Sequence, residues 1–508
     1  MISEQPEQSA ESFGAGKTNV AGHHPSDAVP ARLLSLDVLK GIAVLGALTV
    51  SIWVFGGFSQ NLQNKLLLHP SGGNYRLYAA VSLLFEGKMQ ALISLVFGAG
   101  MLLFMAKWQK LDIGKAHDYL VRRQMWLMAI GILNAIIFLW PKDLLFQLGV
   151  VGILLIPFLH LAPKNLWIAA SLFSLAFFGK QYWNYSDDRK ALRKYEAVVL
   201  VEKKIKQDSL NQAKKDSIAK AAKVASGTGL PKDSTKLAKD SAKEKVKADT
   251  LTKKQKEEKE AWEGMLKSMK YDAKNDSGKI KSMRNTSYGE LWDHLLPIAQ
   301  SREAEWTYRI GVWELSMMIL LGLALFKMDF FHNRFSTGKY LLVAMVCIAM
   351  GLLLGWYRLY FHNATLLDYT KFIKNHTLPF NFFIPLERSA MAIGYASLVM
   401  ALIGHGKPRW LWQALAATGR LSLTNYLVQS IFCTIFFTGF GMNNYSRLEQ
   451  LELYLVVAEI WLVQIVFSVF WLRFYTQGPA EWLWRCLVEK KWKPIPKQEK
   501  IPGTVALA

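Results

Sequence analysis

The sequence predicts an all-α protein, a polytopic membrane helix bundle of about ten transmembrane helices that carries a disordered or helical polar insert. Of the 508 residues, 52% are hydrophobic and only 20% are charged, and the mean hydropathy is +0.14. The charge gathers in one segment, residues 186–286, which holds 27 Lys and Arg against 16 Asp and Glu. A formal charge of +22 is typical of nucleic-acid-binding proteins, but this apolar content excludes a soluble basic protein, so we expect no nucleic-acid partner. The composition also excludes a disulfide scaffold and a wholly disordered chain.

The hydrophobic residues form runs long enough to cross a lipid bilayer. A spanning helix needs roughly 20 apolar residues, because the hydrocarbon core is about 30 Å thick and each residue rises about 1.5 Å. The runs that meet this length lie on both sides of the polar insert. The predicted spans are 36–58, 77–106, 123–140, 144–162 and 166–183 before the insert, and 308–326, 340–357, 380–404, 421–439 and 451–472 after it.

The distribution of Lys and Arg predicts the orientation of these spans. Basic residues are more frequent in alternate short loops, among them 107–123, than in the loops between them. Because loops rich in Lys and Arg stay in the cytoplasm, we expect a multi-pass protein of the cell inner membrane with both termini cytoplasmic. The predicted parts are a cytoplasmic tail (1–35), an N-terminal membrane half (36–185), a Lys-rich extracytoplasmic insert (186–286), a C-terminal membrane half (287–472) and a cytoplasmic interfacial segment (473–508).

Cysteine and histidine show no metal-binding pattern. The three Cys are widely spaced and lie in or beside apolar runs, as buried small hydrophobic residues do. The ten His form no HExxH motif and no helical pair, and no CxxC spacing occurs. We therefore predict no metal site.

Charged residues at the ends of two spans are candidates for binding a substrate or an acyl donor. Asp37 and Lys40 open the first span and are three residues apart, so they share a helix face and can pair. They either line a cytoplasmic entrance or form an interfacial cap with a snorkelling lysine. Arg122 and Arg123 begin the third span, where they either anchor the helix or bind an anionic acyl donor.

Glu387 and Arg388 are the strongest charge signal inside a predicted span. Adjacent residues do not share a helix face, so each needs a partner on another helix. A role in a substrate pathway and a structural salt bridge both remain open. Asn425 and Gln429 lie four residues apart on one face, where they either link helices or line a pathway.

Glu86 lies before the glycine-rich stretch Phe97-Gly98-Ala99-Gly100. Such glycines more often let two helices approach closely than bind phosphate, and no Gly-Lys-Ser/Thr follows them. We therefore predict helix packing for the glycines and retain Glu86 as a candidate pocket residue.

Two segments, 419–430 and 471–485, resemble signature sequences of the YeiB-like family of bacterial multi-pass membrane proteins. The opening 32–41 is similar to the start of that family's first helix, and the resemblance covers nearly the whole chain except the first 30 residues and the insert. Its most specific residues are Gly478, Pro479, Glu481, Trp482 and Arg485. On their physics alone, these residues are typical of a structural foot at the membrane interface, in which Glu481 and Arg485 pair.

The resemblance implies a domain of unknown function related to transmembrane acyltransferases and connected with transport. Such enzymes move an acyl group from a cytoplasmic donor, such as an acyl-CoA, to an acceptor across the membrane. The chain departs from the family pattern at Lys40, where the family has Arg, at Ser51, where it has Asn, and at Asn134, where it has His. Asn cannot act as a general base, whereas Asp143 keeps the family's nearby acid.

Three functions follow as hypotheses. The first is an acyltransferase-like enzyme in the bilayer. The charged residues of the first and third spans would hold the donor near the inner face, and an envelope glycan or lipid would be the acceptor. The second is a transporter of a small solute, with Glu387 and Arg388 in its pathway. The third is a non-catalytic membrane scaffold. Beyond an acyl-CoA donor, no cofactor is predicted.

Overall fold

A computed structural model of the chain describes residues 33–109, 113–225, 251–269, 273–284, 286–406 and 408–497. These residues belong to one compact unit of helices. They contain no β-strand, and their only β-type contact is a bridge between Tyr475 and Lys497. The prediction of an all-α fold is confirmed. Residues 1–32 of the predicted tail and 226–250 of the insert lie outside the described residues.

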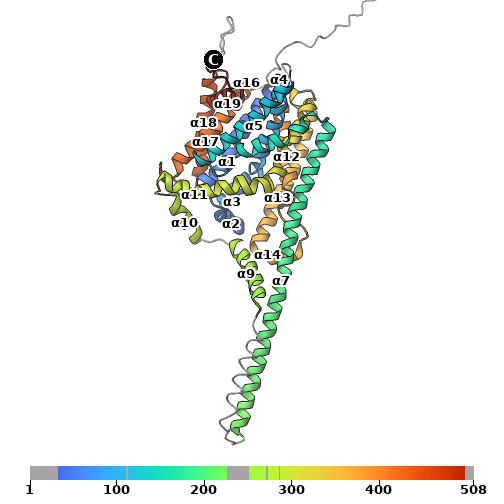
Figure 1. Cartoon of the computed structure of the whole chain (residues 1–508), viewed down its shortest axis with the longest axis vertical. Helices are drawn as coiled ribbons and strands as arrows, with labels where there is room; N and C mark the ends of the chain where they lie inside the picture. Colours follow the sequence, from blue (N-terminus) through green and yellow to red (C-terminus); the bar gives the residue numbers. More distant parts are fainter. Residues whose placement is uncertain are drawn as a thin grey trace, which may run out of the picture. The chain divides into compact units, whose positions relative to one another are not determined.

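Apart from α7 and α9, most helices that are consecutive in the chain have short connections (Figure 1). In chain order they are α1 (Leu34–Phe55), α2 (Gln60–Leu68), α3 (Gly72–Leu84), α4 (Lys88–Gln109), α5 (Ile113–Ile136), α6 (Leu145–Leu154), η1 (Ile156–His160), α7 (Pro163–Ala225), α9 (Lys253–Met269), α10 (Ala273–Met283), α11 (Tyr288–Gln300), η2 (Ser301–Gly311), α12 (Val312–Lys327), η3 (Phe330–His332), α13 (Thr337–Leu367), α14 (Tyr369–Asn375), α15 (Ile384–Gly404), α16 (Arg409–Arg420), α17 (Ser422–Phe437), α18 (Gln450–Trp471) and α19 (Pro479–Glu489).

Within the described residues, six helical stretches are long and apolar enough to cross a membrane. All six coincide with predicted spans. Two further predicted spans, 144–162 and 421–439, contain the shorter apolar helices α6 and α17. The six stretches are α1, Gly72–Gln109, Tyr288–Lys327, α13, α15 and α18.

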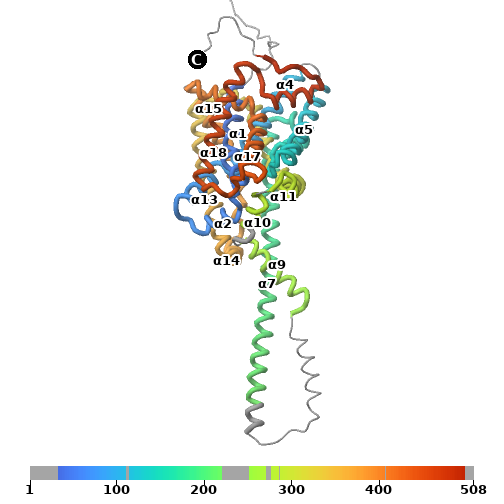
Figure 2. The backbone as a smooth tube through the Cα atoms, turned by 90° about the vertical axis from the view of Figure 1, so that its left-hand side faces the viewer, coloured from blue at the N-terminus to red at the C-terminus, as the bar shows by residue number. Residues whose placement is uncertain are grey.

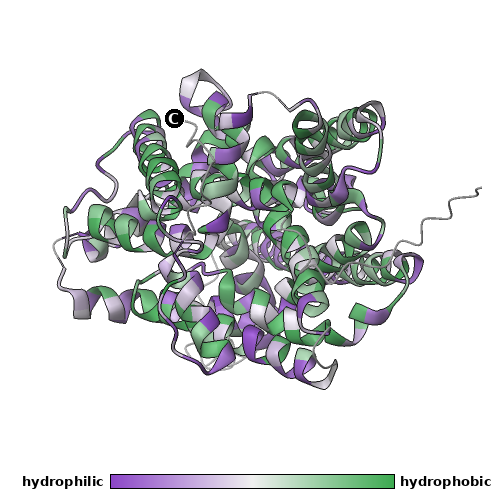
Figure 3. Ribbon diagram, turned by 90° about the horizontal axis from the view of Figure 1, so that it is seen from above, coloured by the Kyte–Doolittle hydropathy of each residue, from purple (hydrophilic) through white to green (hydrophobic). Residues whose placement is uncertain are grey.

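The outward faces of some helices are apolar, whereas a soluble protein has mostly polar side chains there. Only 22% of the most apolar window of α13 and 28% of that of α18 are buried. Leu353 and Trp356 of α13 and Leu462 of α18 are among their exposed side chains. Figure 3 shows hydrophobic residues on the outward sides of the helices as well as between them. Such a surface matches lipid and not water.

Glycines let pairs of helices pack at backbone distance. α12 packs on both α4 and α7, and α1 packs on α16. A Cβ at Gly98 of α4 would collide with the carbonyl of Ile319, and one at Gly322 of α12 would collide with the carbonyl of Leu95. Gly100 has nothing within 4 Å of its Cβ position. The packing role predicted for the two glycines of α4 therefore holds for Gly98, whereas the prediction for Gly100 is wrong, because Gly100 faces open space.

The described part of the polar insert is helical. α7 has 63 residues and passes residue 186 without a break, and α9 packs beside it (Figure 2). Lys259 bonds Glu202 at 2.6 Å, and Trp262 is buried in a cluster with Tyr195. Residue 186 thus marks a change from apolar to polar surface along one helix, because helical propensity continues where hydropathy falls.

Candidate functional site

Glu387 lies at the centre of a buried group of charges. It accepts hydrogen bonds from Lys88 Nζ and from Arg358 Nε, the latter at 3.0 Å. Lys88 is fully buried and Glu387 nearly so. Arg358 also bonds Glu86 at 3.2 Å. We call these four residues the Glu387 network; it ties the α3–α4 turn to α13 and α15.

Arg388 pairs with a helix that Glu387 does not contact, because adjacent residues on a helix point in different directions. Its guanidinium pairs with Glu314 of α12, which is buried. Gly87 makes this possible, since its φ of 73° suits only a residue without a side chain and a Cβ there would collide with the Arg388 guanidinium. The predictions did not include Arg358 or Glu314, although each is an isolated charge in an apolar run, the signal that revealed Glu387.

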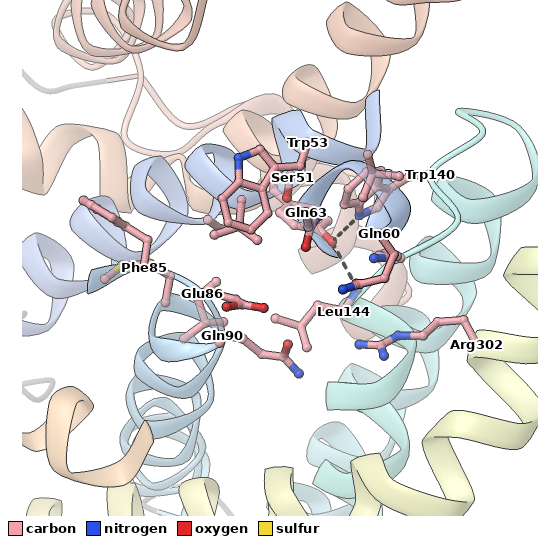
Figure 4. A pocket seen from close by; sticks show the side chains of 18 residues that line it. Ser51, Trp53, Gln60, Gln63, Phe85, Glu86, Gln90, Trp140, Leu144 and Arg302 are labelled. Atoms are coloured by element: carbon pink, nitrogen blue, oxygen red, sulfur yellow. Dashed lines mark hydrogen bonds between the residues drawn. The ribbon is translucent and has the colours of Figure 1, made fainter. Parts of the chain in front are cut away.

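A cavity of about 180 Å³ lies beside the Glu387 network. We call it the Trp140 pocket. In Figure 4, Glu86 and Gln90 point into it from one side and Arg302 from the other. Its wall combines aromatic rings with amides and charges, the pattern of a small-molecule site. The lining includes Ser51, Trp53, Gln60, Gln63, Phe85, Glu86, Gln90, Trp140, Lys142, Arg302 and Tyr426.

Two donors at this pocket have no acceptor within the described residues. Arg302 stacks on Trp306, 3.1 Å from its ring centre, and its buried Nε donates no hydrogen bond. The buried Nε2 of Gln90 is also unpartnered. Arg302 belongs to η2, a π-helical stretch, and such stretches are frequent at functional sites. Both donors are therefore available to a ligand in the Trp140 pocket.

Asp143 is a buried carboxyl in the loop between α5 and α6, outside the spanning helices. It accepts hydrogen bonds from Asn134 Nδ2 at 2.8 Å, from the Phe146 backbone N–H at 2.9 Å and from the Tyr426 hydroxyl at 3.3 Å. Burial raises the pKa of this carboxyl to about 6. Asp143 therefore exchanges a proton near neutral pH, which Asn134 cannot do.

Tyr426 connects Asp143 with the Trp140 pocket. Tyr426 lines the pocket, and its hydroxyl also accepts hydrogen bonds from Trp140 Nε1 at 3.0 Å and from the Leu144 N–H at 3.1 Å. Ser51 lines the same pocket. Ser51 thus lines the cavity, and Asn134 lies next to it through its hydrogen bond to Asp143.

A second cavity, of about 200 Å³, lies at the opposite end of α4. We call it the Arg123 pocket. The Arg123 guanidinium lies 5.1 Å from the ring centre of Phe104 and 4.8 Å from that of Trp484, and one of its nitrogens has no hydrogen-bond partner. Lys107 and Arg485 also line this pocket. Within the described ranges no three His, Cys, Asp or Glu side chains are placed to hold a metal ion. The Arg and Lys side chains of both pockets are suited to anionic ligands.

The other charged candidates do not join Arg123. Asp37 and Lys40 pair at 3.6 Å on α1, as their spacing predicts. Arg122 bonds Asp118 at 3.1 Å on an exposed part of α5. The expected donor site built from all four residues is therefore not formed, since only Arg123 lines the Arg123 pocket.

Asn425 and Gln429 bond to α18. Asn425 Nδ2 donates to Ser468 Oγ at 3.1 Å, and Gln429 Nε2 donates to Gln464 Oε1 at 2.9 Å. Gln464 in turn donates to the Asn425 carbonyl at 2.9 Å. These side chains form polar links between α17 and α18, of the kind that hold apolar helices together.

Gly478 and Pro479 start a new helix after the last span. α18 ends at Trp471, and α19 begins at Pro479, whose fixed φ suits the first turn. Trp482 Nε1 donates to the Lys493 carbonyl at 2.6 Å, which ties α19 to the segment that follows it.

Glu481 has a different partner from the one predicted. It accepts hydrogen bonds from the backbone N–H groups of Leu423 at 2.7 Å and Thr424 at 3.1 Å, so it caps the start of α17. Arg485 bonds Glu489 at 2.8 Å. The predicted Glu481–Arg485 pair is therefore wrong, because the open N-terminus of α17 offers Glu481 stronger donors.

Sequence comparison shows which known proteins the chain resembles. Residues 325–491 match the family described as Protein of unknown function (DUF418). The chain is similar to uncharacterized protein YeiB of Escherichia coli (strain K12), with 25% identity over 90% of this chain and 96% of the relative. Similarity to uncharacterized protein YxaH of Bacillus subtilis (strain 168) is 26% over 92% of this chain and 97% of the relative. The resemblance to the YeiB-like family is confirmed.

A third relative matches a shorter part of the chain, and the DUF418 region covers only part of the candidate site. An uncharacterized 39.9 kDa protein in the amylase 3′ region of Bacillus acidopullulyticus is 31% identical over 20% of this chain and 29% of its own length. No solved structure matches the chain. The DUF418 region includes the α13–α15 part of the Glu387 network and all of α19. Asp143 and Arg302 lie before it in the chain, within the longer YeiB-like similarity.

The raised pKa of Asp143 predicts a specific pH dependence of stability. The folded state holds the Asp143 proton more tightly than the unfolded state does, so ionisation between about pH 4 and about pH 6 destabilises the fold. At about 1.4 kcal/mol per pKa unit, this loss is at most about 3 kcal/mol. Asp143→Asn removes the titration. We expect the free energy of unfolding of the wild type to fall relative to this variant as pH rises from 4 to 7. A constant difference between the two across that range would contradict the burial of an ionisable Asp143.

Proposed function

We propose that the chain is an acyltransferase-like protein of the bacterial inner membrane, which transfers an acyl group from a cytoplasmic donor to an envelope acceptor in the Trp140 pocket. The observation that carries the proposal is the pair of pockets at opposite ends of α4, each with a buried Arg nitrogen that lacks a partner. An enzyme that works across a membrane needs one site at each face. The near-neutral carboxyl of Asp143 beside one of them supplies a proton acceptor.

The positive-inside bias of the loops supports the assignment of faces. With both termini cytoplasmic, the Arg123 pocket lies at the inner face and the Trp140 pocket at the outer face. In this arrangement α5, α6, the first part of α7 and α17 also lie in the membrane, which brings the number of membrane helices to about ten.

The Arg123 pocket suits an acyl-CoA donor. Lys107, Arg123 and Arg485 are cations of the kind that bind phosphate oxygens. Between the two pockets, Gln124 of α5 and Gln147 of α6 are buried with no hydrogen-bond partner at either end of their amides. For the thioester arm of the donor to reach the Trp140 pocket, the helices around Leu92, Leu95 and Ala99 have to separate, and these amides would then offer it polar contacts.

The Trp140 pocket suits a hydroxyl or amine of an envelope glycan or lipid. Trp and Phe rings beside amide side chains are typical of sugar contacts. In the reaction the acceptor oxygen forms a bond to the acyl carbon and the carbon–sulfur bond breaks. The hydroxyl of the acceptor substrate donates a hydrogen bond to the Tyr426 oxygen in place of Trp140 or Leu144. Its proton then passes through the Tyr426 hydroxyl to Asp143. The thiolate that leaves takes a proton from cytoplasmic water.

Acyl transfer by the purified full chain tests the proposal. Labelled acetyl-CoA is incubated with the protein and envelope extract, and label in envelope lipid and glycan is counted. Tyr426→Phe removes only the hydroxyl that connects pocket and base, so we expect at least about a hundredfold lower transfer. Tyr395→Phe is the matched control, because Tyr395 bonds the Leu84 carbonyl at 2.7 Å outside both pockets. Absence of transfer together with absence of acetyl-CoA binding by calorimetry would reject the enzyme.

Transport is the second candidate, favoured by the same unpartnered amides of Gln124 and Gln147. Leu92, Leu95 and Ala99 of α4 fill the core alongside, each at most 2% exposed, so transport would require these helices to separate. A transporter predicts that a labelled solute crosses the membrane unmodified. A scaffold predicts neither transfer nor movement.

A further inference from the structure

The Trp140 pocket adjoins a second cavity of about 240 Å³, which we call the His294 pocket. Both cavities are lined by Trp53, Gln60 and Lys142, so Lys142 stands in the wall that they share. The His294 pocket adds largely apolar side chains such as Leu295. The two cavities therefore share a wall, and the His294 pocket is the more apolar of the two.

Positive charge exceeds negative charge along these two cavities. Lys142 and Arg302 line the Trp140 pocket, and Lys279 lines the His294 pocket. Glu86 is the only carboxylate among the residues that line the two described cavities. Its charge is already engaged, because it accepts hydrogen bonds from Arg358 and from Ser82.

The two cations of the Trp140 pocket lack a counter-ion of their own. Within the described residues, no carboxylate bonds Lys142, and the buried Nε of Arg302 has no partner. Burial and the nearby charge of Arg302 both lower the pKa of Lys142, and the charge of Glu86 only partly offsets them. Glu314 is bonded to Arg388, and Asp143 accepts its hydrogen bonds from other groups. Two like charges near each other in a partly dry site destabilise each other, and an anion bound to both would relieve the repulsion.

We infer that Lys142 and Arg302 bind the phosphate group of a phosphate ester, with the remainder of the ligand in the aromatic and apolar part of the two pockets. A phosphate offers several oxygens, so it accepts from the Arg302 Nε and from the Lys142 ammonium together. A carboxylate has fewer oxygens and a single charge. The inference rests on the proposed function in one respect, since it makes the acceptor a phosphate-bearing compound of the envelope. The phosphate comes either from a lipid headgroup or from a soluble ester.

Binding to the purified full chain in uncharged detergent tests the inference without any acyl transfer. Dioctanoyl phosphatidic acid, dioctanoylglycerol and inorganic phosphate are titrated separately by calorimetry. We expect saturable binding of phosphatidic acid and none of dioctanoylglycerol, which has the same chains without phosphate. Phosphatidic acid at least tenfold tighter than inorganic phosphate assigns a lipid headgroup. Equal affinities assign a soluble phosphate ester.

Variants locate the phosphate. Arg302→Gln and Lys142→Gln should each weaken phosphatidic acid binding at least tenfold, and Arg302→Lys should restore part of it in a folded protein. Arg309→Gln on the same η2 helix and the exposed Lys164→Gln are the controls, each expected to stay within twofold of the wild type. Equal binding of dioctanoylglycerol, or unchanged binding in the Arg302→Gln, Lys142→Gln double variant, overturns the inference. Loss of acyl transfer with phosphate binding retained would reject the proposed enzyme and leave the phosphate site standing.

Discussion

Glu387→Ala should lower the free energy of unfolding by about 3–5 kcal/mol, the range for a buried ion pair that loses one partner. Lys88 and Arg358 would remain buried, with Glu86 as their only nearby carboxylate among the described contacts. Unfolding in mixed detergent micelles, followed by tryptophan fluorescence, measures the change. The size of the effect follows from burial, since the Lys88 and Glu387 side chains are 0% and 2% exposed.

An exposed pair provides the control for this variant. Glu305 pairs with Arg309 within η2, and both side chains are more than half exposed. Glu305→Ala should therefore change stability by no more than about 1 kcal/mol. If Glu387→Ala were no more damaging than Glu305→Ala, the Glu387 network would be solvated and the packing of α13 and α15 around it would be wrong.

Gly98→Ala and Gly100→Ala should have opposite effects on stability although the two residues are only two positions apart on α4. At Gly98 the new methyl group meets the Ile319 carbonyl of α12, which is backbone and cannot move aside. Separation of the two helices should cost about 1–3 kcal/mol. Gly100 faces open space, so alanine there should stabilise the helix by about 0.5–1 kcal/mol.

The same unfolding measurement separates the two glycine variants. Equal destabilisation by both would mean that the loss comes from helix propensity and not from the α4–α12 contact. A neutral Gly98→Ala would contradict the backbone approach of Gly98 to Ile319. Gly322→Ala, which meets the Leu95 carbonyl in the same interface, should behave like Gly98→Ala.

The sequence predicted the fold class because apolar runs of about 20 residues are typical of helices that span a membrane. It was less informative on the number of spans, since 123–140 and 166–183 mix apolar and polar residues and α6 and α17 are short. Composition also predicted the polar insert but did not show that α7 continues into it. Polarity sets the surface of a helix, whereas its ends depend on caps and packing.

Part of the candidate site was visible in the sequence. Glu387 and Arg388 stood out as charges in an apolar run, but Lys88 is 299 residues away from Glu387 in the chain, and no spacing rule joins them. Tyr426 looks like an ordinary aromatic residue of a membrane helix, and Arg302 lies in a π-helical stretch that carries no sequence signal. The charged residues of the first and third spans were predicted to form one site because both spans begin at the cytoplasmic face. The sequence predicted how deep these residues lie in the membrane, but not which helices they face.

Membrane vesicles of opposite orientation test the central claim, that donor and acceptor bind at opposite ends of α4. Acetyl-CoA does not cross a bilayer, so label added to inside-out vesicles reaches only the proposed Arg123 side. We expect labelled envelope acceptor in inside-out vesicles, none in right-side-out vesicles, and none in either with Tyr426→Phe. Transfer in right-side-out vesicles alone, or in neither preparation, would contradict the account.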